Sequence, residues 1–298
     1  MRLQNMHWRR VKDNLAGKSM HLAVAFANSI VFLIILGLFL QSKPILTQKS
    51  ILDLLFSSSW HPLKGDFGFY PFIIGTLEVT ALAMIFAVPV CLLSAIYLAE
   101  YAHRRFRELA HVVIDIMAAI PSVIYGLWGV IVIVPFVRIL GHVLDTPTTG
   151  YSLLAGGIIL AIMVSPIIIS VSMEVLRTVP IQARETALAL GTTKWEAIKQ
   201  VVLRSGLHGI FSAIVLGFTR AFGETIAVLM IVGNVPEVPS SIFDPAYPLP
   251  ALLANHYGEM MSIPLYNSAL LLSALILLLV VSAFNLMAHF TLLRIEKR

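Results

Sequence analysis

Long apolar segments separated by polar stretches dominate the pattern of this chain. Each segment has at least about 20 residues, the length that an α-helix needs to cross a bilayer. The pattern therefore predicts an all-α polytopic membrane protein with six transmembrane helices, at about residues 20–40, 72–99, 112–137, 153–173, 207–232 and 265–290.

Composition supports a membrane protein and excludes several classes of function. The chain is 58% hydrophobic and only 12% charged, whereas soluble domains carry about 25% charged residues. The single cysteine, Cys91, lies in an apolar segment, and the nine histidines lack the paired spacing of a metal site. No pattern of a nucleophile, a catalytic dyad or an oxidoreductase site is present. We predict a protein that is not an enzyme and binds neither a metal nor nucleic acid.

The basic residues predict the orientation in the membrane. Six spans place both ends on one side, and sixteen of the 21 Lys and Arg residues lie on that side, against four in the opposite connections. By the positive-inside rule both termini are cytoplasmic. The predicted organisation is a cytoplasmic tail, a first helix with its connection on the opposite side of the membrane, a transmembrane domain and a second cytoplasmic tail, at residues 1–18, 19–71, 72–290 and 291–298.

One polar break, Gln182 to Arg204, lies between the fourth and fifth spans. Pro180 suits the first turn of a helix, and Gly191 suits the left-handed residue that closes one. Thr193 and Glu196 stand at the spacing of a capping box. The break therefore predicts two short helices joined at a glycine at a membrane surface. An amphipathic loop without a partner remains the alternative.

The residues of this break resemble the "EAA" signature of the permease subunits of ABC importers. The matching positions are Glu185, Thr186, Ala187, Gly191, Val201 and Leu203. Thr186 and Val201 are mild departures, whereas Arg204 stands where proline is usual. The resemblance implies the type I (MetI-like) permease fold and cytoplasmic coupling helices at 180–204 that dock an ATPase. The coupling residues that it implies are Arg184, Glu185, Thr186, Ala187 and Gly191.

Two charged residues fall inside the fifth predicted span. Arg220 lies thirteen residues beyond Leu207, about 20 Å along a helix, and Glu224 would follow one turn later on the same face. A charge at the centre of a span costs about 2.5–3.5 kcal/mol on insertion scales. We interpret Arg220 as a donor to a passing anion and Glu224 as its partner. A brace between helices remains the alternative.

A second resemblance narrows the substrate. The stretches Arg220–Val228 and Ile231–Asn234, with Tyr125–Gly129 and Leu252–Asn255, are similar to PstC-type permease subunits of the bacterial high-affinity phosphate importer. That family implies import of phosphate by alternating access across the bacterial cytoplasmic (inner) membrane, with a periplasmic connection after the first helix. We expect the phosphate to pass near Arg220 and Glu224. The family also implies a PstA-type second permease, two PstB-type ATPase subunits that bind ATP and Mg²⁺, and a PstS-type binding protein. This chain would bind no cofactor itself. A permease for molybdate or sulfate and a sensor of phosphate status remain alternatives.

Overall fold

A computed structural model describes residues 2–296 and shows a helical membrane protein. Six helices are long and apolar enough to cross a membrane, which confirms the predicted number of spans. They are Lys12–Gln48, Tyr70–Tyr101, Ser122–Val143, Leu153–Thr178, Lys194–Phe222 and Pro264–Thr291. Met1, Lys297 and Arg298 of the predicted tails lie outside the described residues.

The elements follow one another with short connections, apart from the segment between α11 and α12. Their bounds are α1 (Arg2–Gln48), α2 (Ile51–Phe56), β1 (Trp60–His61), η1 (Pro62–Lys64), β2 (Asp66–Phe67), α3 (Tyr70–Ile96), η2 (Tyr97–Tyr101), α4 (Arg104–Ala119), α5 (Ser122–Trp128), η3 (Gly129–Ile133), α6 (Val134–Val143), α7 (Leu153–Thr178), α8 (Ile181–Ala189), α9 (Lys194–Ala197), η4 (Ile198–Val202), α10 (Leu203–Phe222), α11 (Ile226–Leu229), α12 (Leu249–His256), η5 (Met260–Ser262) and α13 (Pro264–Glu296).

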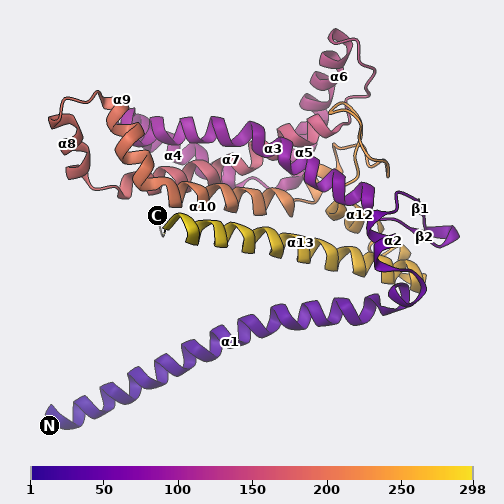
Figure 1. Ribbon diagram of the computed structural model, residues 1–298, viewed down its shortest axis with the longest axis horizontal. Coiled ribbons are helices and arrows are strands. Elements are labelled where there is room, and N and C mark those ends of the chain that lie inside the picture. Colours follow the sequence, from indigo (N-terminus) through magenta and orange to yellow (C-terminus); the bar gives the residue numbers. More distant parts are fainter. Residues whose placement is uncertain (1, 297–298) are drawn as a thin grey trace.

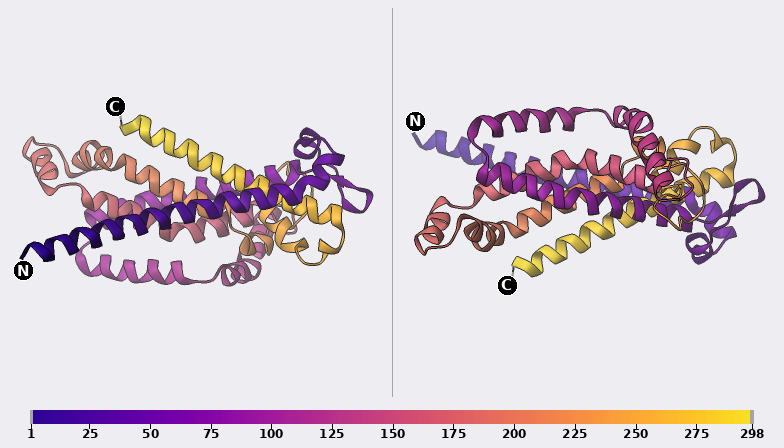
Figure 2. Two further views of the ribbon diagram at one scale, coloured as in Figure 1. Left: turned by 90° about the horizontal axis from the view of Figure 1, so that it is seen from below. Right: turned by 90° about the horizontal axis from the view of Figure 1, so that it is seen from above.

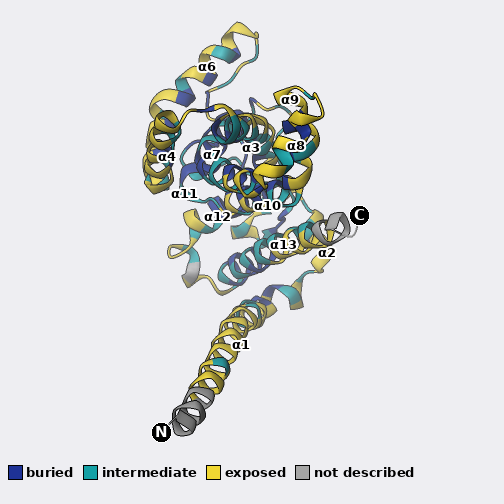
Figure 3. Ribbon diagram, turned by 90° about the vertical axis from the view of Figure 1, so that its left-hand side faces the viewer, coloured by how far each residue is buried: buried dark blue, intermediate teal, exposed yellow. Residues whose placement is uncertain are grey.

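The centre of the bundle is α7, packed between α3 and α10 (Figures 1 and 3). Small residues bring these helices together. A Cβ atom added to Gly157 would lie 2.9 Å from the Leu82 side chain of α3, and one added to Gly217 would lie 2.5 Å from Ile168 of α7. Close packing of this kind holds helices together in lipid, where burial of apolar surface provides no driving force.

The first helix, α1, leaves the bundle. It runs along α13 near its own C-terminal end and then diverges (Figures 1 and 2). At the contact, Ile45 is fully buried and its backbone N–H donates to Ser268 Oγ at 3.1 Å. Farther out, Leu22 is 74% exposed. The helix extends beyond the predicted span at both ends, through residues predicted as a polar tail and past Pro44 to Gln48.

The third predicted span is divided at a proline. The apolar pattern predicted one helix over residues 112–137, but α4 ends at Ala119 and a new helix begins at Ser122. Ile120 has an extended ψ of 126°, since the residue before Pro121 is disfavoured in the helical region. Beyond the break, α6 points away from the bundle axis, whereas α4 runs alongside the bundle (Figures 1 and 3).

The segment after α11 folds back on the bundle at the end opposite α8. Ser240 Oγ donates to Asp244 Oδ2 at 2.7 Å, and the backbone N–H groups of Ser240 and Ser241 donate to the same oxygen. The hydrogen bond from Ser240 lowers the pKa of Asp244 below its ordinary value. Nearby, Tyr247 and Phe72 join an aromatic cluster that includes Trp60 and Tyr266.

Candidate functional site

The turn between the fourth and fifth spans projects from one end of the bundle, and the start of α1 and the end of α13 lie at the same end (Figure 1). Gly191 has a φ of +84°, the left-handed conformation that its position predicted. Thr193 Oγ1 accepts from Glu196 N at 3.3 Å, while Glu196 Oε2 accepts from Thr193 N at 2.7 Å. The local geometry read from the sequence is thus present.

Two details of this turn differ from the prediction. Pro180 is the N-cap of α8, one position before the first helical turn, and its extended ψ of 139° directs the chain into the helix. The second short helix, α9, is not a separate element. It continues through η4 into α10, so that one helix runs from Lys194 to Phe222. The fifth span therefore begins within the segment predicted as coupling helices.

The outer surface of the turn carries exposed apolar side chains beside an acidic one. Glu185 and Thr186 are exposed, whereas Ala187 is buried against the bundle. Leu190 is 80% exposed and Trp195 is 49% exposed. Large apolar side chains at the tip of a projecting turn are typical of a protein interaction surface.

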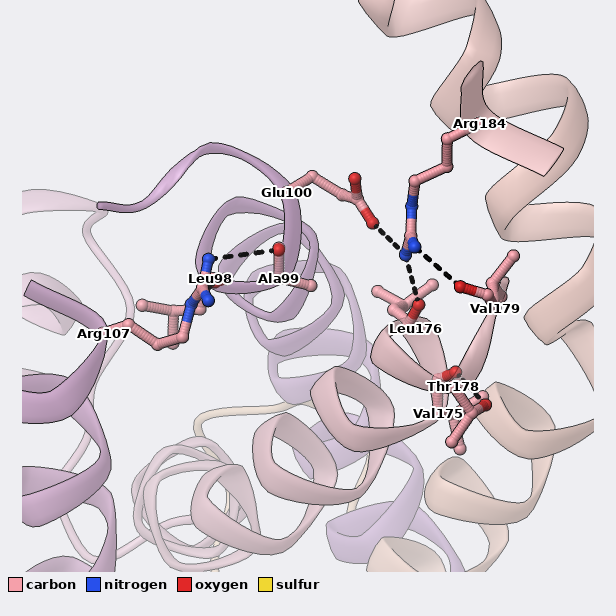
Figure 4. A network of polar contacts seen from close by, with 9 residues as sticks. All are labelled: Leu98, Ala99, Glu100, Arg107, Val175, Leu176, Thr178, Val179 and Arg184. Carbon is pink, nitrogen blue, oxygen red and sulfur yellow. Dashed lines mark hydrogen bonds and ion pairs between the residues drawn. The ribbon is translucent and has the colours of Figure 1, made fainter. Parts of the chain in front are cut away.

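Arg184 lies on the inner side of α8 (Figure 4). Its guanidinium donates to the backbone oxygens of Leu176 and Val179, both at 2.7 Å. It also forms an ion pair of 2.8 Å with Glu100 Oε1, in which the side chains of Arg184 and Glu100 are 21% and 8% exposed. The structure thus places Arg184 away from the exposed Glu185 and Thr186.

Glu100 belongs to η2, the π-helical turn at the end of α3, and sequence reasoning did not select it. The only signal in the sequence was a carboxylate directly after an apolar segment. Its ion-pair partner, Arg184, lies 84 positions away, so sequence spacing did not connect the two residues. The turn is also held from other directions. Arg107 of α4 donates to Leu98 O at 2.7 Å, and Lys194 lies 4.4 Å from the centre of the Tyr101 ring.

The second predicted site lies where α10 ends. Arg220 is exposed in the last turn of α10, which ends at Phe222 and is followed by Gly223. Glu224 therefore leaves the helix, and its Oε1 accepts from Ala227 N of α11 at 3.3 Å. The expectation that both residues share one helical face is wrong. Within the described residues, none of the three ion pairs includes Arg220 or Glu224.

Below Arg220 and the exposed Leu216, a polar face runs along α10 toward α8. Exposed or half-exposed polar side chains on it are Ser212, His208, Ser205 and Arg204. Thr219 Oγ1 also donates to Asn285 of α13 at 2.7 Å. A membrane helix with such a face meets water or another protein rather than lipid.

Three further carboxylates lie on helices α3, α4 and α7 and form none of the ion pairs among the described residues. Glu78 is half-buried in α3. Asp115 and Glu174 are exposed on α4 and α7.

Comparison with protein families identifies the chain more closely. Residues 87–298 match the family described as binding-protein-dependent transport system inner membrane component. The phosphate transport system permease protein PstC of Xylella fastidiosa (strain 9a5c) is 36% identical over 266 residues, which cover 84% of this chain and 82% of that protein. The probable ABC transporter permease protein YqgH of Bacillus subtilis (strain 168) is 33% identical over 294 residues. This matched region covers 97% of this chain and 94% of that protein.

Solved structures share the fold. A bacterial alginate ABC transporter in complex with a pentasaccharide-bound periplasmic protein matches with a TM-score of 0.68 and 16% identity, covering 97% of this chain and 98% of that one. An inward-facing MetNI methionine ABC transporter matches with a TM-score of 0.58 and 19% identity. The match covers 74% of this chain and 93% of that one. The predicted type I permease fold is confirmed. The chain belongs to the inner membrane components of binding-protein-dependent transport systems and, within that family, to the PstC-type permeases.

Proposed function

We propose that this chain is the permease subunit that conducts inorganic phosphate into a bacterial cell by alternating access. It would pair with a PstA-type permease to enclose the path. Two PstB-type ATPases bind ATP and Mg²⁺ in this assembly; one of them would dock on α8, and a PstS-type protein would deliver phosphate at the opposite end. The similarity to PstC proteins along most of the chain supports this assignment.

The unpaired guanidinium of Arg220 is the observation that carries the proposal. It lies in a membrane-spanning helix, it is exposed, and within the described residues no carboxylate forms an ion pair with it. A charge without a partner in a span is costly, so a ligand that supplies the opposite charge is favoured. The planar fork of arginine matches the oxygens of phosphate. The polar face of α10 below it would offer further donors toward the cytoplasm.

Uptake of labelled phosphate tests this function directly. Cells lacking the chain are expected to lose high-affinity phosphate uptake and to regain it when the chain is restored. Excess unlabelled phosphate should abolish the signal, whereas molybdate and sulfate should not. Competition by molybdate or sulfate would identify a different oxyanion. Unchanged uptake with altered gene regulation would instead indicate a sensor.

Cysteine labelling tests the proposed orientation. With Cys91 replaced by alanine, single cysteines at Ser59 and Glu237 are expected to react with a membrane-impermeant reagent added to intact cells. A cysteine at Ala189 of α8 should react only after the membrane is opened. All three positions are exposed in the structure. Both termini and α8 are cytoplasmic in this proposal, because sixteen basic residues lie on that side. Reaction of the Ala189 variant in intact cells would reverse the orientation.

A further inference from the structure

Contacts on the inner face of α8 join this helix to the bundle, so they determine how a movement of α8 is passed to the spans. Its outer face is available to an ATPase, and its inner face packs against η4 at the start of the fifth span. In addition, one side chain of α8 makes three polar contacts to the ends of two other spans. Arg184 contacts the end of α7 through Leu176 O and Val179 O, and the end of α3 through Glu100.

The contacts to α7 use groups that its helix leaves unpaired. The last carbonyl groups of a helix have no partner within it, and the C-terminal end of the helix attracts a cation. Leu176 and Val179 are at that end of α7. Because the guanidinium is planar and has several donors, it can bond both oxygens and a carboxylate at once, which a lysine cannot do in the same geometry.

The contact to α3 is a shielded ion pair. The Glu100 side chain is only 8% exposed, so neither water nor salt screens the pair as they would at a surface. The turn that carries Glu100 is itself fixed by Arg107, which donates to Leu98 O, Ala99 O and Ala102 O. Figure 4 shows Glu100 bonded to Arg184, with Arg107 beside Leu98 and Ala99 of the same turn. A force on Arg184 therefore acts on an anchored turn rather than on a free side chain.

We propose that the Arg184–Glu100 ion pair is the link that carries displacement of α8 to α3, and that Glu100 is a positioning residue for transport. The inference rests on the proposed function in one respect, that an ATPase docks on α8. In this arrangement α3, α7 and α8 move as one body when the ATPases close. Loss of the pair leaves α8 able to move without α3.

Glu100→Gln and Arg184→Lys test the link in the assembled transporter. Both variants are expected to hydrolyse ATP at the wild-type basal rate but to import about tenfold less phosphate per ATP, the change that corresponds to a lost coupling free energy of about 1.4 kcal/mol. Glu174→Gln and Arg177→Gln are matched controls, because both residues are exposed near the end of α7 and outside the network. These controls should transport normally.

A distance measurement separates transmission from a merely structural role. Spin labels at Val90 of α3 and Ala189 of α8, in a chain with Cys91 replaced by alanine, should keep one distance with and without trapped nucleotide. Glu100→Gln should make that distance depend on nucleotide. A distance that stays constant in Glu100→Gln, or normal uptake per ATP, would overturn the proposal. This readout needs no substrate, so it remains valid even if the transported anion is not phosphate.

Discussion

Replacement of Arg220 by glutamine is expected to reduce phosphate uptake about 10- to 100-fold while the transporter still assembles. A hydrogen bond to a charged group contributes about 1.5–3 kcal/mol, and each 1.4 kcal/mol changes an equilibrium about tenfold. Assembly should survive, because Arg220 is exposed and forms no ion pair within the described residues. The measurement is uptake normalised to the amount of purified complex.

Companion variants decide whether Arg220 meets the anion or braces helices. Arg220→Lys retains the charge but loses the fork, so uptake should fall with normal assembly. Arg138→Gln, which changes an exposed arginine of α6 that lies off the polar face of α10, is the matched control and should transport normally. A brace with Glu224 would instead predict that Arg220→Gln combined with Glu224→Gln restores uptake. The structure argues against such rescue, since Glu224 Oε1 contacts the start of α11.

Replacement of Gly191 by valine is expected to uncouple ATP hydrolysis from transport. The φ of Gly191 is +84°, and a Cβ atom added there would meet nothing within 4 Å. Crowding is therefore not the reason for the effect. A left-handed conformation costs an ordinary L-residue about 1–2 kcal/mol, and the β-branch increases the strain. The turn would shift the surface formed by Leu190 and Trp195, and we expect phosphate uptake to fall about tenfold.

Gly191→Asn is the control for this variant, because asparagine tolerates the left-handed region. It should retain most of the uptake and of the substrate-stimulated ATPase activity. Glu185→Lys should behave like Gly191→Val, since it reverses a charge on the exposed face of α8. Wild-type uptake and ATPase stimulation in both Gly191→Val and Glu185→Lys would show that this turn does not transmit movement.

The sequence by itself determined the features that depend on local physics. Runs of apolar residues revealed the six spans because a lipid environment demands a continuous apolar helix of sufficient length. The turn at Gly191 and the capping box of Thr193 and Glu196 were also predictable. Each depends on residues at most three positions apart, whose conformational preferences act before any tertiary contact forms.

Only the tertiary structure decided which charges meet and where spans break. Hydropathy alone did not divide the helix at Pro121 or end α10 before Glu224, because both breaks lie within apolar segments. Arg184 appeared to be a docking residue by its place in the motif, yet it faces inward to Glu100, 84 positions away. Sequence spacing determines which residues share a helical face, but the packing of α3, α7 and α8 determines which of those faces is buried and therefore which charges must find partners there.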